Sequence, residues 1–67
     1  MLLSVPVEEA LRILEHQEKA LGNVAAGILV RSYRLYGEWN EAQVYQANRI
    51  ISEVEAAKKR TFSPRNW

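Results

Sequence analysis

The chain has 67 residues, of which 48% are hydrophobic and 25% are charged, and its formal net charge is +1. This length excludes more than one small domain, and this composition excludes a disordered chain. Cysteine and aspartate are absent and His16 is the sole histidine, so we expect neither disulfides, nor a metal, nor any other cofactor. Because a chain this short rarely builds a self-sufficient core, we expect it to form a homo-oligomer.

The N-terminus and the hydropathy pattern predict a protein of the cytoplasm. Residues 1–7 lack the basic start of a signal peptide. The longest apolar run, from Val24 to Val30, is seven residues long, whereas a membrane span needs about 20. A net charge near zero gives no general reason to expect binding to duplex DNA. We therefore expect neither membrane nor duplex DNA as a partner.

A long first helix is predicted over residues 6–36. Pro6 suits the first position of a helix, Glu8 and Glu9 follow at the positive end of its dipole, and Ser4 is the better cap. Hydrophobic residues then recur every seven positions in constant phase, at Val7, Leu14, Leu21, Ile28 and Leu35. An unbroken phase over five positions favours one continuous helix.

The pair Gly22-Asn23 allows a second interpretation. Glycine is typical of a helix end and asparagine of a helix start, so two separate helices are the alternative. Because the repeat is not reset and no Glu or Gln follows three residues after Asn23, we favour one helix kinked at Gly22. The neighbouring small residues would admit a close crossing by a helix of another subunit, or they are merely tolerated; they are Gly22, Ala25, Ala26 and Gly27.

A second helix is predicted over residues 41–60. Gly37 ends the first helix, and Asn40 with Gln43 forms a capping box for the second. Trp39 and Val44 flank this cap with the spacing of a hydrophobic staple. Proline at position 64 prevents continuation and leaves residues 61–67 as a tail. The apolar face of the second helix comprises Val44, Ala47, Ile50, Ile51, Val54 and Ala57.

These elements predict an all-α fold, an antiparallel two-helix hairpin with its turn at residues 37–40. A lone hairpin leaves half of each apolar stripe exposed, so we expect several copies to assemble into a helical homo-oligomer. The expected oligomer interface comprises Leu14, Leu21, Gly22, Ala25, Ile28, Leu35, Ile51 and Val54.

The side chains needed for catalysis are scarce. His16 falls on the flank of the first helix between Glu15 and Gln17, where a solvent-facing role is the simpler interpretation. Together with Glu15 and Glu18 it would make only a weak metal site. We therefore expect a protein that is not an enzyme.

Two groups of residues are candidates for binding a phosphorylated ligand, since arginine grips phosphate and aromatic rings stack on bases. The expected ligand-binding residues are Arg31, Tyr33, Arg34 and Tyr36 at the hairpin, and Lys58, Lys59 and Arg60 near the C-terminus. In a hairpin these groups lie at different ends of one subunit, so two antiparallel subunits would be needed to combine them. The alternative is that the aromatic residues close the end of the bundle and the arginines are solvated.

The sequence resembles the small phage proteins that block CBASS immunity by sequestering cyclic oligonucleotides. The resemblance lies in Glu18 with Leu21-Gly22, and in a last helix that runs through Ile50 and Ala57 into Phe62-Ser63-Pro64. It covers about a third of the chain, which is shorter than that family and has Ala56 where the family has tryptophan. The resemblance implies an all-helical, non-catalytic homo-oligomer whose interfaces bind cyclic nucleotides.

Two functions follow as hypotheses. The first is an anti-defence protein, acting in the cytosol of the phage's host, that sequesters cyclic nucleotide signals. The second is a helical protein–protein interaction module, an adaptor or inhibitor that binds a host or partner protein.

Overall fold

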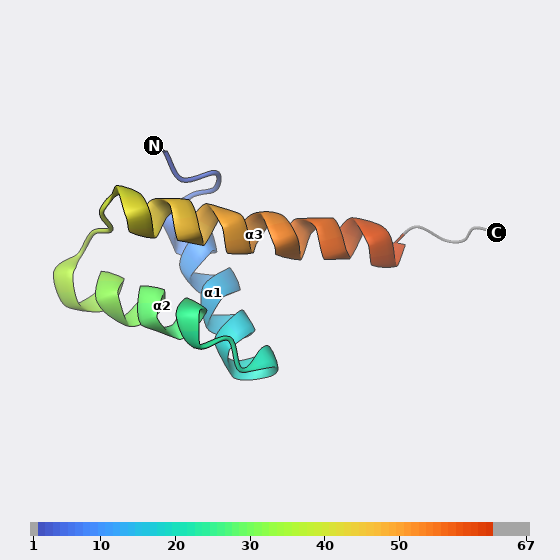
Figure 1. Ribbon diagram of the computed structural model, residues 1–67, viewed down its shortest axis with the longest axis horizontal. Helices are drawn as coiled ribbons and strands as arrows, with labels where there is room; N and C mark the ends of the chain where they lie inside the picture. The colour runs from blue at the N-terminus through green and yellow to red at the C-terminus, as the bar shows by residue number, and fades with distance from the viewer. Residues whose placement is uncertain (1, 63–67) are drawn as a thin grey trace.

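The computed structural model describes residues 2–62, apart from the side chains of residues 59–62. Over this range the chain forms three helices and no strand: α1 (Val7–Leu21), α2 (Val24–Tyr36) and α3 (Glu41–Phe62) (Figure 1). The all-α class predicted from the sequence is thereby confirmed. The last helix runs two residues further than predicted, and the rest of the expected tail, residues 63–67, lies outside the described residues. Within residues 2–62, no helix combines the length and the apolar composition that a membrane span requires.

The single long helix predicted over residues 6–36 is wrong, because the chain breaks at Gly22-Asn23. Gly22 adopts a left-handed conformation with φ of 68°, which suits glycine and ends a helix. Its N–H and that of Asn23 donate to the carbonyls of Glu18 and Gln17. Asn23 then caps α2, since its Oδ1 accepts from the N–H of Ala26 at 3.1 Å. The structure thus has three helices in place of the expected two-helix hairpin.

The N-terminal segment is held by α3 rather than capping α1. The cap of α1 is Pro6, with no side-chain hydrogen bond, so the role expected of Ser4 is not observed. Instead, the N–H of Ser4 donates to Oδ1 of Asn48 at 2.7 Å, and Nδ2 of Asn48 donates to the carbonyl of Leu2 at 2.8 Å. Leu3, between the two bonded residues, packs against the hydrophobic core.

The junction between α2 and α3 follows the sequence prediction closely. Gly37 ends α2 in a left-handed conformation with φ of 79°. The capping box is reciprocal: the N–H of Asn40 donates to Oε1 of Gln43 at 3.0 Å, and the N–H of Gln43 donates to Oδ1 of Asn40 at 2.9 Å. Trp39 packs against the core and donates from Nε1 to the carbonyl of Leu29 at 2.8 Å. Its proposed staple with Val44 stays a prediction.

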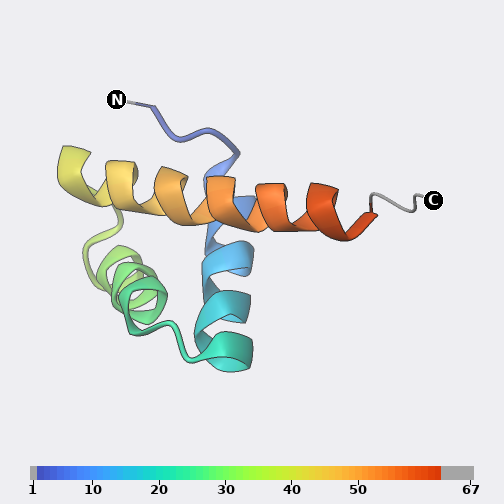
Figure 2. The ribbon, with the colours of Figure 1, turned by 45° about the vertical axis from the view of Figure 1, so that its right-hand side comes forward.

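All three helices contribute to one small core. In both ribbon views α1 crosses α3 and α2 lies beside α1, below the N-terminal half of α3 (Figures 1 and 2). Every fully buried hydrophobic residue belongs to one of the three helices; these residues are Ala10, Leu14, Ala26, Leu29, Val30, Ala47 and Ile51.

The C-terminal half of α3 extends beyond the helices that support it. With 22 residues α3 is about 33 Å long, whereas the 15 residues of α1 span about 22 Å. Each residue from Ser52 to Lys58 is exposed except Val54, which is half-buried. This overhang, residues 52–58, lies on the side of α1 opposite α2 (Figure 2).

The small residues of α2 do admit a close approach, but from α1 of the same chain. Ala26 and Gly27 are buried. A Cβ atom placed on Gly27 would overlap the carboxylate of Glu18, which lies over this position. The prediction that a helix of another subunit crosses here is therefore wrong at Gly27, because Glu18 of α1 already fills the space over it.

We predict that Gly22→Ala lowers the free energy of unfolding by about 1 kcal/mol, because a Cβ atom is strained in the left-handed region. Urea denaturation followed by circular dichroism measures the change. The control is Gly22→Asn, which should lose clearly less, since asparagine tolerates this conformation. Equal losses in the two variants would contradict the conformational explanation.

Candidate functional site

The two arginines expected to bind phosphate are paired with glutamates of α1. Nη1 of Arg31 lies 3.3 Å from Oε2 of Glu18, and Nη2 of Arg34 lies 3.1 Å from Oε2 of Glu15. All four side chains are at least partly exposed, so each pair contributes little to stability on its own. Together they form a polar seam along the contact of α1 with α2.

Glu15 is the centre of this seam. It accepts a hydrogen bond from Arg34, and the ammonium group of Lys19 lies 3.6 Å away. The hydrogen bond from Arg34, and then the positive charge of Lys19, lower the pKa of the Glu15 carboxyl below its ordinary value.

The tyrosines of the hairpin have separate environments. The ring of Tyr33 meets Trp39 edge to face, with centroids 5.1 Å apart, so it helps to close the end of the bundle, as the alternative interpretation proposed. Tyr36 is exposed. Arg31, Tyr33, Arg34 and Tyr36 therefore do not converge on one pocket within the described residues.

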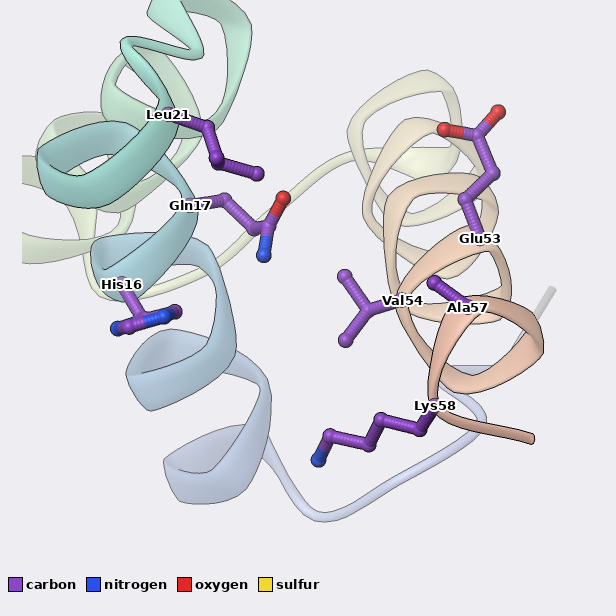
Figure 3. A pocket seen from close by; sticks show the side chains of 7 residues that line it. All are labelled: His16, Gln17, Leu21, Glu53, Val54, Ala57 and Lys58. Carbon is purple, nitrogen blue, oxygen red and sulfur yellow. The ribbon is translucent and has the colours of Figure 1, made fainter. Parts of the chain in front are cut away.

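The basic group near the C-terminus is described only in part. Lys58 lies on the overhang of α3, whereas the side chains of Lys59 and Arg60 lie outside the described residues. Lys58 reaches toward α1 and helps to line a groove (Figure 3).

This groove lies between α1 and the overhang of α3, and its volume is about 550 Å³. Leu21 of α1 faces Val54 and Ala57 of α3 across it (Figure 3). A second hollow of about 300 Å³ continues it toward the start of α1. We call the two together the α1/α3 groove; its lining residues are Glu9, Arg12, Ile13, His16, Gln17, Leu21, Glu53, Val54, Ala57 and Lys58.

Charges border the apolar floor of the groove. Arg12, His16 and Lys58 all line the second hollow, with Glu9 as its only acidic lining residue. Neither Arg12 nor Lys58 forms an ion pair with another described side chain. Glu53 borders the larger hollow and lies 4.0 Å from Arg49. The groove is thus apolar along its floor and mainly basic where it reaches the start of α1.

Most of this groove was not anticipated from the sequence. His16 was expected to face solvent, and it is exposed at the edge of the groove. Val54 was expected in an oligomer interface, and no role was predicted for Ile13. One signal was present in the sequence: beside the unbroken repeat, the apolar pairs Ala10-Leu11 and Val24-Ala25 are separated by the polar pair Gln17-Glu18 at the corresponding positions. Gln17 now lines the groove and Glu18 pairs with α2.

The expected oligomer interface is divided by the structure. Leu14 and Ile51 are fully buried in the chain's own core, so they are not available to another subunit. Val54 is half-buried in the groove. Gly22, Ala25, Leu21, Ile28 and Leu35 are exposed, and these positions remain open to a partner.

Metal or catalytic chemistry has no evident site among residues 2–62. No three His, Cys, Asp or Glu side chains of this part of the chain gather as metal ligands. Carboxylate and imidazole groups do occur in the groove, at Glu9 and His16 of α1 and at Glu53 of α3, but they do not gather as a set of three metal ligands.

We predict that acid weakens the fold partly through Glu15. Because the pKa of its carboxyl is lowered from the ordinary 4.5 in the folded chain, its stabilising contribution is present above that value and is lost as the pH falls through the folded pKa. Urea unfolding at a series of pH values should show a shallower acid loss for Glu15→Gln than for the parent chain. The matched control is Glu55→Gln, which removes an exposed glutamate of α3 outside the polar seam; equal slopes in all three proteins would contradict the prediction.

Comparisons of the chain with protein-family models, with curated proteins and with solved structures find no significant match.

Proposed function

We propose that the protein is a non-catalytic helical interaction module that binds an acidic amphipathic helix of a partner protein in the α1/α3 groove. The observation that carries this proposal is the overhang of α3, whose Val54 and Ala57 face Leu21 across an open apolar floor (Figure 3). Insertion of an amphipathic helix into an apolar groove is a common mode of peptide recognition.

The charges around the groove specify the partner's polar residues. Arg12 and Lys58 border one end and have no ionic partner among the described side chains, and His16 lines the same hollow. A helix with leucine-like residues on one face and glutamates beside them complements this arrangement. Such charge complementarity sets specificity and association rate more than affinity.

Sequestration of a cyclic nucleotide is the second candidate. It is supported by the resemblance to the phage proteins and by the cations of the groove, which offer phosphate a binding site. The hairpin supports it less than expected, because Arg31 and Arg34 already have glutamate partners. An anti-defence role in the cytosol of a phage host belongs to this second proposal.

Self-association is part of both proposals. The chain is short, and Leu21, Ile28 and Leu35 remain exposed after folding. Exposed apolar residues in such number are typical of an association surface. We therefore propose that the functional form is a homo-oligomer and that the host or partner protein binds to it.

The groove is tested by selecting binders from a displayed library of amphipathic helical peptides. We expect the enriched peptides to carry acidic residues beside their apolar face. Lys58→Glu or Arg12→Glu should weaken each selected peptide about tenfold or more, which corresponds to about 1.4 kcal/mol. Fluorescence anisotropy measures the dissociation constants.

The matched control is Lys19→Glu, which makes the same charge change on α1 outside the groove and should leave the affinity unchanged. Selected peptides that are basic, or that bind all variants equally, would contradict the proposed site. Calorimetric titration with cyclic di- and trinucleotides tests the second candidate. Heat that disappears in Arg12→Glu and Lys58→Glu supports it, and no heat with any of these nucleotides rejects it.

A further inference from the structure

The outer face of α2 is apolar although it faces away from the core. Residues 24–30 contain no polar side chain. Ala26, Leu29 and Val30 are buried in the core. In contrast, Val24, Ile28 and Leu35 are 68%, 54% and 74% exposed. A helix that is apolar on all sides is normally covered on all sides.

The exposed residues of α2 are spaced as one seam of a coiled coil. Val24, Ile28 and Leu35 lie on one face together with Arg31, so that the intervals along the helix are four, three and four residues. These intervals match the alternation of a heptad repeat. They are also the same when the helix is followed in the opposite direction, so an antiparallel copy presents the same seam.

We propose that a second copy of this chain covers this face, with its α2 antiparallel about a twofold axis. The inference rests on the proposed self-association. It adds that α2 forms the interface and that the two copies of α2 run in opposite directions. Val24 of one copy packs against Leu35 of the other, and Ile28 packs against the aliphatic stem of Arg31. Each contact occurs twice, as twofold symmetry requires.

Charge complementarity along the seam favours the antiparallel orientation. Gly27 and Arg34 flank the seam on the same side, near opposite ends of α2. In an antiparallel pair of helices, Arg34 of one copy therefore faces Gly27 of the other. The carboxylate of Glu18 lies over Gly27, so the arrangement brings Arg34 of one copy toward Glu18 of the other.

A parallel pair would lack this attraction. It would place Arg31 beside Arg31 of the second copy at the same level, and like charges in contact disfavour an interface. In the antiparallel pair each Arg31 keeps Glu18 of its own chain, 3.3 Å away, while its stem covers Ile28. Long basic side chains commonly bury their stems in this way.

The dimer would leave the α1/α3 groove accessible. The α2 helix and the overhang of α3 lie on opposite sides of α1 in Figure 2. Pairing through α2 therefore produces a particle with two grooves, one on each copy. Two grooves on one particle raise the effective affinity for a partner that carries two suitable helices.

The orientation is tested by disulfide trapping, for which the absence of cysteine is an ideal background. Val24→Cys and Leu35→Cys are prepared separately in the full chain, and each is oxidised alone and as an equal mixture. We expect the mixture to yield a covalent dimer that joins the two variants. Neither variant should cross-link alone, because positions 24 and 35 are 11 residues, or about 16 Å, apart along α2, and a disulfide needs Cα atoms within about 7 Å.

Each other outcome overturns the inference. Efficient cross-linking of Val24→Cys with itself indicates a parallel pair. A mixture that stays uncross-linked while sedimentation shows a dimer places the interface elsewhere on the chain. A monomer at every concentration rejects self-association through α2, whereas the peptide titrations of the groove are independent of this result.

The energy of the seam is tested by sedimentation equilibrium of Ile28→Asp. A charge at the centre of the interface should raise the dimer dissociation constant at least tenfold, and circular dichroism should remain unchanged because Ile28 is more than half exposed in the single chain. The matched control is Tyr45→Asp, which replaces an exposed aromatic residue of α3 and should leave the dissociation constant unaltered. Equal effects of the two substitutions would overturn the assigned interface.

Discussion

The reversal of the chain at Gly22 and Asn23 is the constraint on which the rest of the structure depends. Gly22 ends α1 in a conformation that favours glycine, and Asn23 begins α2 through a bond to Ala26. Because α2 then returns along α1, Gly27 can lie against Glu18. The core contacts, the two ion pairs and the outward face of α2 are all consequences of this one turn.

The length of α3 determines where the α1/α3 groove forms. The shorter helices support only its first half, through Ala47 and Ile51. Beyond Ile51, residues 52–58 are exposed except for the half-buried Val54. The α1/α3 groove exists because α3 extends past the helix that it crosses. Leu21, Val54 and Ala57 form its apolar floor.

Two surfaces thus remain after folding, and they differ in character. The outer face of α2 is apolar and repeats symmetrically, properties that suit a second copy of the same chain. The α1/α3 groove combines an apolar floor with Arg12 and Lys58, which form no ion pair with another described side chain, and it has no such symmetry; these properties suit a different partner. Because the two surfaces lie on opposite sides of α1 (Figure 2), the proposed dimer and the proposed helical partner would not compete for the same surface.

The sequence by itself determined the all-α class, the end of α2 at Gly37 and the capping box of Asn40 and Gln43. These features depend on hydrogen bonds between residues three or four apart, so local sequence specifies them. The turn at Gly22-Asn23 is equally local, and the sequence allowed it as the alternative of two separate helices in place of one. The constant phase of Leu21, Ile28 and Leu35 obscured it, because that repeat follows the surface of the single chain and not its core.

Only the tertiary structure decided the roles of Arg31, Arg34 and the groove. On one continuous helix, Glu18 and Arg31 would lie 13 residues, or about 20 Å, apart, and the arginines would have no evident partner. The reversal at Gly22 brings Arg31 within 3.3 Å of Glu18 and Arg34 within 3.1 Å of Glu15, so both arginines have partners in the chain itself. The groove likewise combines residues about 40 positions apart, such as Gln17 and Ala57. Its existence depends on how α1 and α3 cross, which the periodicity of neither helix specifies.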